Sequence, residues 1–179
     1  MNASSHFDNT LRYRSAWHPQ QTHITPPYIL DPVLLAMGGR LDLDPCTLPD
    51  NPLHASEFYA PPRDGLSLPW GTGTIFVNPP YGKAKEPWVL KCVEAGAAGA
   101  TVVLLIPSQT DTRIFHAALG SAEAVVFIRG RVKFGQPRPN GRQMAASHPS
   151  ALIGWNTDLA PCGVLGRVVQ LKPRGTVTP

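Results

Sequence analysis

Four consecutive residues carry the groups best suited to chemistry in this sequence: Asn78, Pro79, Pro80 and Tyr81. The side-chain amide of Asn78 and the backbone carbonyl of Pro79 provide hydrogen-bond acceptors, and Tyr81 provides a flat aromatic face. Two acceptors beside an aromatic ring suit a planar group that bears an NH2. The pattern therefore predicts a site for an amino group on a ring; the alternative is a proline-rich turn.

The segment just before these residues is expected to position them. Ile75, Phe76 and Val77 predict a buried central strand, because β-branched and aromatic residues suit a pleated surface. The prolines end this strand, since they lack an N–H and have a fixed φ. Asn78 is therefore expected at the carboxyl end of a strand, where open α/β sheets bind their ligands.

A second polar group is expected at the same edge of the sheet. Residues 40–46 alternate apolar and polar side chains, which predicts the first strand. Leu41 and Leu43 would face inward, whereas Asp42 and Asp44 would face outward or toward the end of the strand. Asp44 directly precedes a proline, so it is either a functional carboxylate at the strand end or a turn residue.

The remaining pattern alternates helices and strands. Thr25-Pro26-Pro27 is expected to provide an N-cap followed by a proline at the first helical position, in a helix that carries apolar residues over 29–37. Strands separated by helices predict an α/β fold with a mostly parallel, doubly wound sheet. The other expected elements are helices over 87–97 and 108–119, strands over 101–106, 124–128 and 150–155, and an edge strand within 164–171.

Positive charge is concentrated between the last two of these inner strands. Residues 129–149 contain five cations and no acidic residue, while the whole chain has a formal charge of +4 and a pI of ≈ 9.2. This segment is expected to be either a loop that binds phosphate groups or a solvent-exposed hairpin. The residues expected to contact nucleic acid are Arg129, Arg131, Lys133, Phe134, Arg138 and Arg142.

Composition limits the other classes of protein. The 179 residues, 42% of them apolar, are enough for one domain with a buried core. Cys46, Cys92 and Cys162 are far apart and odd in number, and the histidines show no ligand spacing. Neither a metal site nor a serine hydrolase is expected. No apolar run is long enough to span a membrane and no signal peptide is evident, so a cytoplasmic protein is expected.

Taken in order, five segments resemble the small phage-type DNA N6-adenine methyltransferase family, over roughly residues 20–157. The resemblance implies a Rossmann-like class I methyltransferase fold, S-adenosylmethionine as the donor, and an adenine in DNA as the acceptor. It also implies a bacterial or phage-infected cell and a link to restriction and modification; a monomer and a homodimer are both compatible. The five segments are Thr25-Pro26-Pro27-Tyr28, Leu41–Cys46, Asp64-Gly65-Leu66, Asn78–Tyr81 and Arg131–Phe134.

The resemblance also implies roles for individual residues. Asn78 and the Pro79 carbonyl would accept the two hydrogens of the target amine, with Pro80 in the same motif. Tyr81 would stack on the flipped base, and Phe134 would be a second aromatic against it. The residues implied to bind the cofactor are Thr25 and Pro26 near its methionine end, Asp44, Pro45 and Cys46 after the first strand, Asp64 and Leu66 near its adenosine, and Asn78.

Two departures from larger methyltransferases accompany this resemblance. No glycine-rich signature follows the first strand, and no separate target-recognition domain is present. Sequence specificity would then come from the basic loop and from an N-terminal arm over residues 1–21. The methyltransferase domain is expected over 22–160 and a C-terminal strand and tail over 161–179.

The motif leaves two rival functions open. The first is an amino-methyltransferase that acts on RNA or on glutamine in proteins, because the same four residues serve those acceptors. The second is a catalytically inactive methyltransferase fold that binds DNA.

Overall fold

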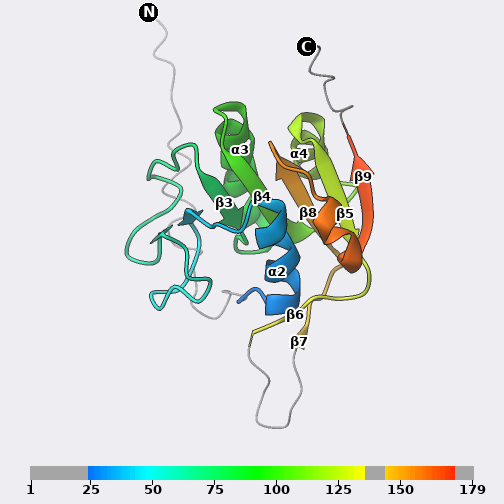
Figure 1. The fold of residues 1–179 in the computed structure, drawn as a ribbon, viewed down its shortest axis with the longest axis horizontal. Helices are drawn as coiled ribbons and strands as arrows, with labels where there is room; N and C mark the ends of the chain where they lie inside the picture. Colours follow the sequence, from blue (N-terminus) through cyan, green and yellow to red (C-terminus); the bar gives the residue numbers. More distant parts are fainter. Residues whose placement is uncertain (1–23, 136–143, 172–179) are drawn as a thin grey trace, which may run out of the picture.

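The computed structural model describes residues 24–135 and 144–171. A seven-stranded sheet of order β2-β1-β3-β4-β8-β5-β9 forms its centre, and a separate pair of strands, β6 and β7, lies beyond one end of it (Figure 1). The strands are β1 (Leu43–Asp44), β2 (Glu57–Phe58), β3 (Thr74–Val77), β4 (Thr101–Pro107), β5 (Ala124–Ile128), β6 (Lys133–Phe134), β7 (Met144–Ala145), β8 (Ser150–Trp155) and β9 (Gly166–Gln170). The helices are α2 (Pro27–Ala36), α3 (Lys85–Ala97) and α4 (Arg113–Ser121), with short 3-10 helices η2 (Gly82–Ala84) and η3 (Ala160–Leu165).

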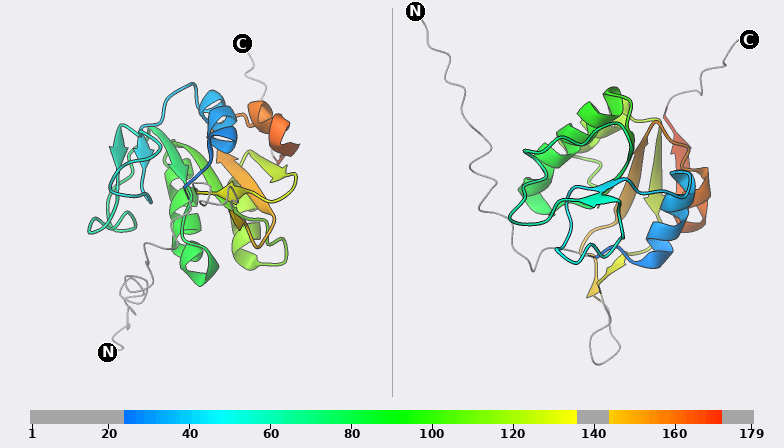
Figure 2. Two further views of the ribbon diagram at one scale, coloured as in Figure 1. Left: turned by 90° about the horizontal axis from the view of Figure 1, so that it is seen from below. Right: turned by 60° about the vertical axis from the view of Figure 1, so that its left-hand side comes forward.

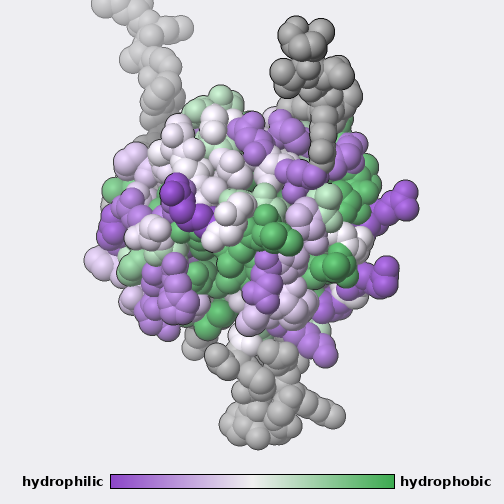
Figure 3. All heavy atoms as spheres, viewed as in Figure 1, coloured by the Kyte–Doolittle hydropathy of each residue, from purple (hydrophilic) through white to green (hydrophobic). Residues whose placement is uncertain are grey.

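Helices cover both faces of the sheet, which confirms the predicted α/β class. Helices α3 and α4 lie on one face, and α2 and η3 lie on the other (Figure 2). Strand β4 contributes side chains to both layers. Val102, Leu104 and Ile106 pack toward α3 and α4, whereas Val103 and Leu105 pack toward α2. The view of Figure 3 shows only small apolar patches on the surface, separated by polar and charged side chains.

Strand β3 is fully enclosed between these layers. Ile75, Phe76 and Val77 each expose 0% of their surface, which confirms the predicted buried strand. The strand pairs in parallel with β1 on one side and with β4 on the other. Asn78 therefore begins the chain segment that leaves the middle of the sheet at its carboxyl edge.

Strand β8 runs against the predicted parallel direction, and the edge strand β9 is also antiparallel. Strands β1 to β5 run parallel to one another, but β8 is antiparallel to both β4 and β5, and β9 is antiparallel to β5. Strand β8 follows β5 through the β6–β7 pair rather than through a crossover helix, so the chain returns in the opposite direction. The C-terminal strand β9 occupies the sheet edge, as predicted, and belongs to the main sheet.

Several local predictions were wrong. Thr25 does not cap α2; Pro26 is the N-cap residue and makes no side-chain capping bond. Helix α4 begins only at Arg113, because the Thr112 hydroxyl accepts the Phe115 N–H at its start. The strand predicted over 40–46 is reduced to two residues, and Asp44 is buried in it.

Some predictions concern other parts of the chain. The arm predicted over residues 1–21 lies outside the described residues. Within residues 24–135 and 144–171, no helix is long and apolar enough to cross a lipid bilayer. The three cysteines are free thiols and all are buried.

The packing of α3 on the sheet predicts a requirement for glycine at position 96. A Cβ there would lie 2.7 Å from Cβ and Cγ of the buried Trp155 in β8. We expect Gly96→Ala to lower the free energy of unfolding by about 1–3 kcal/mol, measured by urea denaturation, because the tryptophan cannot move without disturbing the core. Gly120→Ala in α4 is the matched control, since no atom lies within 4 Å of its Cβ position. It should stabilise the protein by up to about 1 kcal/mol. Equal effects of the two variants would contradict this packing.

Candidate active site

The four-residue motif forms a rigid turn between β3 and α3. Pro79 and Pro80 are buried, and their fixed φ angles restrict the backbone on leaving the strand. Gly82 then adopts a φ of 81°, a left-handed conformation that glycine accepts without strain and that directs the chain into η2 and α3. The turn therefore holds Asn78 and Tyr81 at the carboxyl end of β3, as the sequence predicted.

Tyr81 packs inward beside a second aromatic residue. Its ring meets that of Phe134 edge to face, with centroids 5.9 Å apart and an interplanar angle of 77°. Burial raises the pKa of the Tyr81 phenol, and the neighbouring Ser150 hydroxyl acts in the opposite direction. Phe134 exposes only 5% of its surface, so it belongs to the core under the β6–β7 pair and does not project from it. The structure thus brings together the two aromatics that the resemblance had placed against the base.

The segment 24–28 joins this turn to the basic hairpin. The Thr25 hydroxyl accepts a hydrogen bond from Asn78 Nδ2 at 3.1 Å. The Tyr28 hydroxyl accepts the Lys133 N–H at 3.1 Å, and the Ile24 carbonyl accepts the N–H of Gly135 at 3.1 Å. One short segment therefore fixes both the motif and the first strand of the hairpin.

Asp44 lies in a small crevice with Asn78. Asp44 exposes only 3% of its surface, and its Oδ1 accepts the Cys46 N–H at 3.2 Å. Burial raises the pKa of Asp44 from 3.8 to about 6, although hydrogen bonds from Cys46 and Thr47 lower it in part. The crevice is lined by Ile24, Thr25, Asp44, Cys46, Thr47, Pro52, Leu53 and Asn78.

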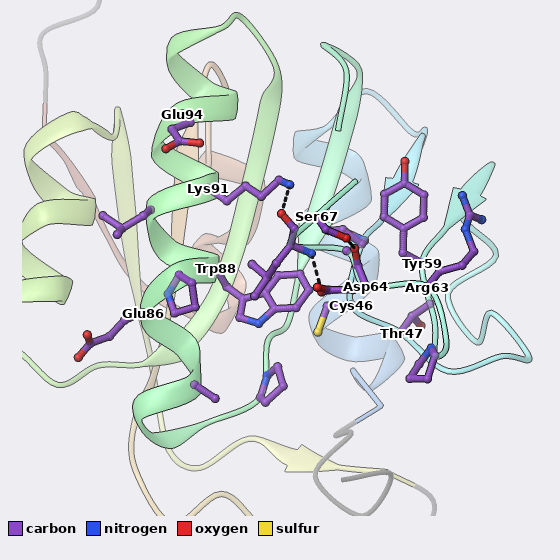
Figure 4. Close-up of a pocket in the computed structure, with 18 of the residues that line it drawn as sticks. Cys46, Thr47, Tyr59, Arg63, Asp64, Ser67, Glu86, Trp88, Lys91 and Glu94 are labelled. Carbon is purple, nitrogen blue, oxygen red and sulfur yellow. Dashed lines mark hydrogen bonds between the residues drawn. The ribbon is translucent and has the colours of Figure 1, made fainter. Parts of the chain in front are cut away.

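A larger cavity of about 620 Å³ lies on the other side of the 45–47 turn. Figure 4 shows its walls, which come from this turn, from the loop after β2 and from α3. Cys46 and Thr47 line both the crevice and the cavity, so the two depressions are neighbours. The predicted cofactor residues Pro45, Cys46, Asp64 and Leu66 all line the larger cavity, together with Pro80 of the motif.

The loop that forms one wall of the cavity is held by hydrogen bonds that side chains donate to its backbone carbonyl groups. Lys91 Nζ donates to the carbonyls of Leu66 at 2.6 Å and Leu68 at 2.7 Å, and the Trp70 indole N–H donates to the carbonyl of Gly65 at 2.8 Å (Figure 4 shows Lys91). A Cβ at Gly65 would collide with the Pro45 carbonyl, so glycine lets the two walls meet. Burial lowers the pKa of Lys91. These bonds keep the cavity wall in place.

Sequence reasoning missed the contribution of α3 to this cavity. Trp88 and Lys91 are three residues apart, so they lie on one face of the helix with Glu94. Trp88 also stacks on Trp70, with ring centroids 6.2 Å apart. The sequence signal that could have revealed this was the spacing of Trp88 and Lys91, which are three residues apart and follow shortly after the motif.

The basic segment forms a short hairpin at the same end of the sheet as Asn78. Arg129, Arg131 and Lys133 are exposed, and among the described residues no carboxylate lies within ion-pair distance of them. Arg131 donates to the Ser147 carbonyl at 2.7 Å, which ties the two arms of the hairpin together. Arg138 and Arg142 lie outside the described residues.

Not every predicted residue reaches a depression. Pro26 lines neither the crevice nor the cavity, and Thr25 reaches only the crevice. Asp42 turns away from the site, since its carboxylate accepts the Thr74 N–H at 2.8 Å and pairs with Arg40 at 2.7 Å. Its hydrogen bonds lower the pKa of Asp42, and they join β1 to β3.

Comparison with known proteins agrees with this arrangement. A model of the family described as DNA N-6-adenine-methyltransferase (Dam) matches residues 9–174. A DNA N-6-adenine-methyltransferase of Haemophilus phage HP1 (strain HP1c1) is 28% identical over 97 residues, which are 53% of this chain and 55% of that protein. The chain thus matches about half the length of this curated relative. The family match extends over most of the chain and includes every described element, so the protein belongs to the DNA N-6-adenine-methyltransferase (Dam) family.

Proposed function

We propose that the protein transfers a methyl group from S-adenosylmethionine to the exocyclic N6 of an adenine in DNA. The observation that carries this proposal is the position of Asn78 and Tyr81 at the carboxyl end of β3, beside a crevice shared with Asp44 and next to a cavity of about 620 Å³. Family membership supports the same reaction. The order of β2, β1, β3 and β4, with an antiparallel β8 beside them, supports a Rossmann-like class I methyltransferase fold.

The cavity has the size and lining that an adenosine group requires. Small-molecule sites typically measure about 300–1,000 Å³ and combine apolar walls with a few polar groups. Here Trp88 and Leu66 provide apolar surface, and Asp64 and Thr47 provide polar atoms. The buried carboxyl group of Asp44 would favour a positive charge nearby, and the adjacent crevice has a volume of only about 10 Å³. S-adenosylmethionine would supply such a charge on its sulfonium, together with a methyl group open to nucleophilic attack.

The residues of the motif would act on the adenine. Its amino nitrogen is a weak nucleophile because the lone pair is delocalised into the ring. Hydrogen bonds from the NH2 group to Asn78 Oδ1 and the Pro79 carbonyl would stabilise the positive charge that develops as the nitrogen attacks. Because the turn is rigid, these acceptors are in position before the reaction, and no covalent intermediate with the protein is needed.

Aromatic contacts and charge would hold the DNA. The adenine must leave the base stack, at a cost of a few kcal/mol, and Tyr81 would offset this cost by packing against the ring. Phe134 contacts the Tyr81 ring edge to face and would support it. Arg129, Arg131 and Lys133 lie on the adjacent hairpin and would neutralise phosphates of the same DNA. The cofactor contacts of Thr25 and Pro26 stay a prediction from the resemblance.

The roles assigned to the motif predict a selective loss on Asn78→Ala. The rate of methyl transfer to duplex DNA should fall by about a hundredfold or more, because one of two preorganised acceptors is lost. Isothermal titration calorimetry should still detect binding of S-adenosylmethionine, since the larger cavity is intact. Thermal unfolding serves as the folding control. Activity equal to that of the wild type would contradict the assignment.

The buried position of Asp44 predicts a pH-dependent stability. Its folded-state pKa of about 6 exceeds the ordinary value of 3.8, so protonation stabilises the folded protein, and this contribution is lost as the pH rises through about 6. The shift corresponds to about 3 kcal/mol. Asp44→Asn should therefore raise the free energy of unfolding by about that amount above about pH 7, and hardly at all below about pH 4.

Denaturant unfolding at both pH values measures this difference. Asp50→Asn is the matched control, because Asp50 is an exposed carboxylate in the loop after β1. Its effect should be small at either pH. A gain in Asp44→Asn that is the same at both pH values would show that burial of the charge is not the cause.

A further inference from the structure

Tyr28 is an exposed aromatic residue to which neither the proposed mechanism nor the resemblance gives a role. It lies in the first turn of α2 and exposes 48% of its surface. Single exposed apolar side chains are common on protein surfaces. Among the described residues, however, the other exposed large apolar side chains are aliphatic, so Tyr28 alone of this group presents a ring. The elements around it indicate what this ring contacts.

The tyrosine is fixed against the basic hairpin. The Lys133 N–H donates to the Tyr28 hydroxyl at 3.1 Å, and the Gly135 N–H donates to the Ile24 carbonyl at 3.1 Å. Two alternate N–H groups of the first arm of the hairpin therefore face the segment 24–28, and α2 begins beside β6 (Figure 1). The ring is held by the helix at its Cα end and by this hydrogen bond at its hydroxyl end.

The hairpin beside Tyr28 carries exposed positive charge. Arg131 and Lys133 are exposed, whereas Val132 and Phe134 are buried, because successive side chains of an extended strand point to opposite faces. Cations of this kind neutralise DNA phosphates. Proteins that hold unpaired nucleotides combine such cations with an aromatic ring on which a base stacks. Tyr28 and its neighbours on the hairpin have this combination.

The proposed reaction creates bases that such a ring could stack on. When the target adenine leaves the helix, its partner base and the adjoining base pairs lose a stacking neighbour. Tyr81 is assigned to the adenine itself, so these bases need another contact. Tyr28 belongs to the short segment that also contacts the motif, since the Thr25 hydroxyl accepts from Asn78 Nδ2 at 3.1 Å. The ring is therefore placed beside the motif as well as beside the cations.

We propose that Tyr28 stacks on a DNA base that loses its stacking neighbour when the target adenine is flipped, and that it thereby stabilises the opened DNA. The proposal rests on the proposed function, because that function requires an adenine to leave the helix. The hydrogen bond to the Lys133 N–H has a positioning role here, since it fixes the ring before DNA binds.

Binding to a duplex with an abasic site tests the proposal. Such a duplex has the same gap in its stack as flipped DNA but offers no adenine to Tyr81. By fluorescence anisotropy, Tyr28→Leu should raise the Kd for the abasic duplex about fivefold or more, because a stacking contact is lost. The Kd for the fully paired duplex of the same sequence should change less than about twofold. An unchanged Kd for the abasic duplex, or an equal loss on both, would overturn the proposal.

Two further variants separate stacking from structural support. Tyr28→Phe keeps the ring but removes the hydroxyl, so both Kd values should stay within about twofold of the wild type. Leu35→Ala is the matched control, since Leu35 is an exposed apolar residue two turns further along α2. It should leave both Kd values unchanged, and thermal unfolding checks the fold of each variant. A loss in Tyr28→Phe as large as that in Tyr28→Leu would mean that the tyrosine only anchors the hairpin.

The salt dependence of binding provides an independent readout. Replacing a cation that contacts a phosphate, as in Lys133→Met, should lower the slope of log K against log salt by about 0.9. Tyr28→Leu should leave this slope unchanged, because stacking releases no counterions. A reduced slope in Tyr28→Leu would overturn the proposal, since the ring would then act only by placing the cations. These titrations need no methyl transfer, whereas failure of the proposed function would appear as a wild-type protein that methylates no DNA.

Discussion

The burial of β3 on both faces is the constraint on which the site depends. Its three apolar residues, 75–77, are completely enclosed between the two helical layers, so the strand cannot shift without exposing core surface. The two prolines then prevent the strand from continuing. Asn78 is the first residue beyond this fixed strand, so the packing of the core determines its backbone position. An amide placed in this way needs no flexible loop to bring it into position.

Two neighbouring depressions lie beside the motif, and they differ in size and in lining. The 45–47 turn separates a polar crevice, where Asp44 and Asn78 meet, from a larger cavity lined by α3 and the loop after β2. The cavity of about 620 Å³ has room for a ligand ring, whereas the crevice measures only about 10 Å³. Lys91 donates hydrogen bonds to two carbonyl groups of the loop, and these bonds fix the position of the cavity wall. The basic hairpin at the same end of the sheet adds three exposed cations, Arg129, Arg131 and Lys133.

Local pattern predicted the elements of this fold well, because periodicity and proline positions are local properties. The strands over 74–77 and 101–107 and helix α3 follow directly from such patterns. Contacts between distant segments were not predictable in this way. The bond from Asn78 to Thr25 joins residues 53 apart, and the alternation that suggested an outward Asp44 gave no information on the segments that bury it. The direction of β8 depends on a connection without a helix, which composition does not reveal.

The most direct test of the central claim identifies the methylated product. The wild-type protein would be incubated with labelled S-adenosylmethionine and, in separate reactions, with unmethylated duplex DNA, RNA and a protein extract, followed by mass spectrometry of the digested acceptors. The account predicts N6-methyladenine in DNA and little label in the other acceptors. Label confined to RNA or to glutamine in protein would contradict the proposed substrate. No transfer to any acceptor, despite measurable binding of the cofactor, would contradict the proposed reaction.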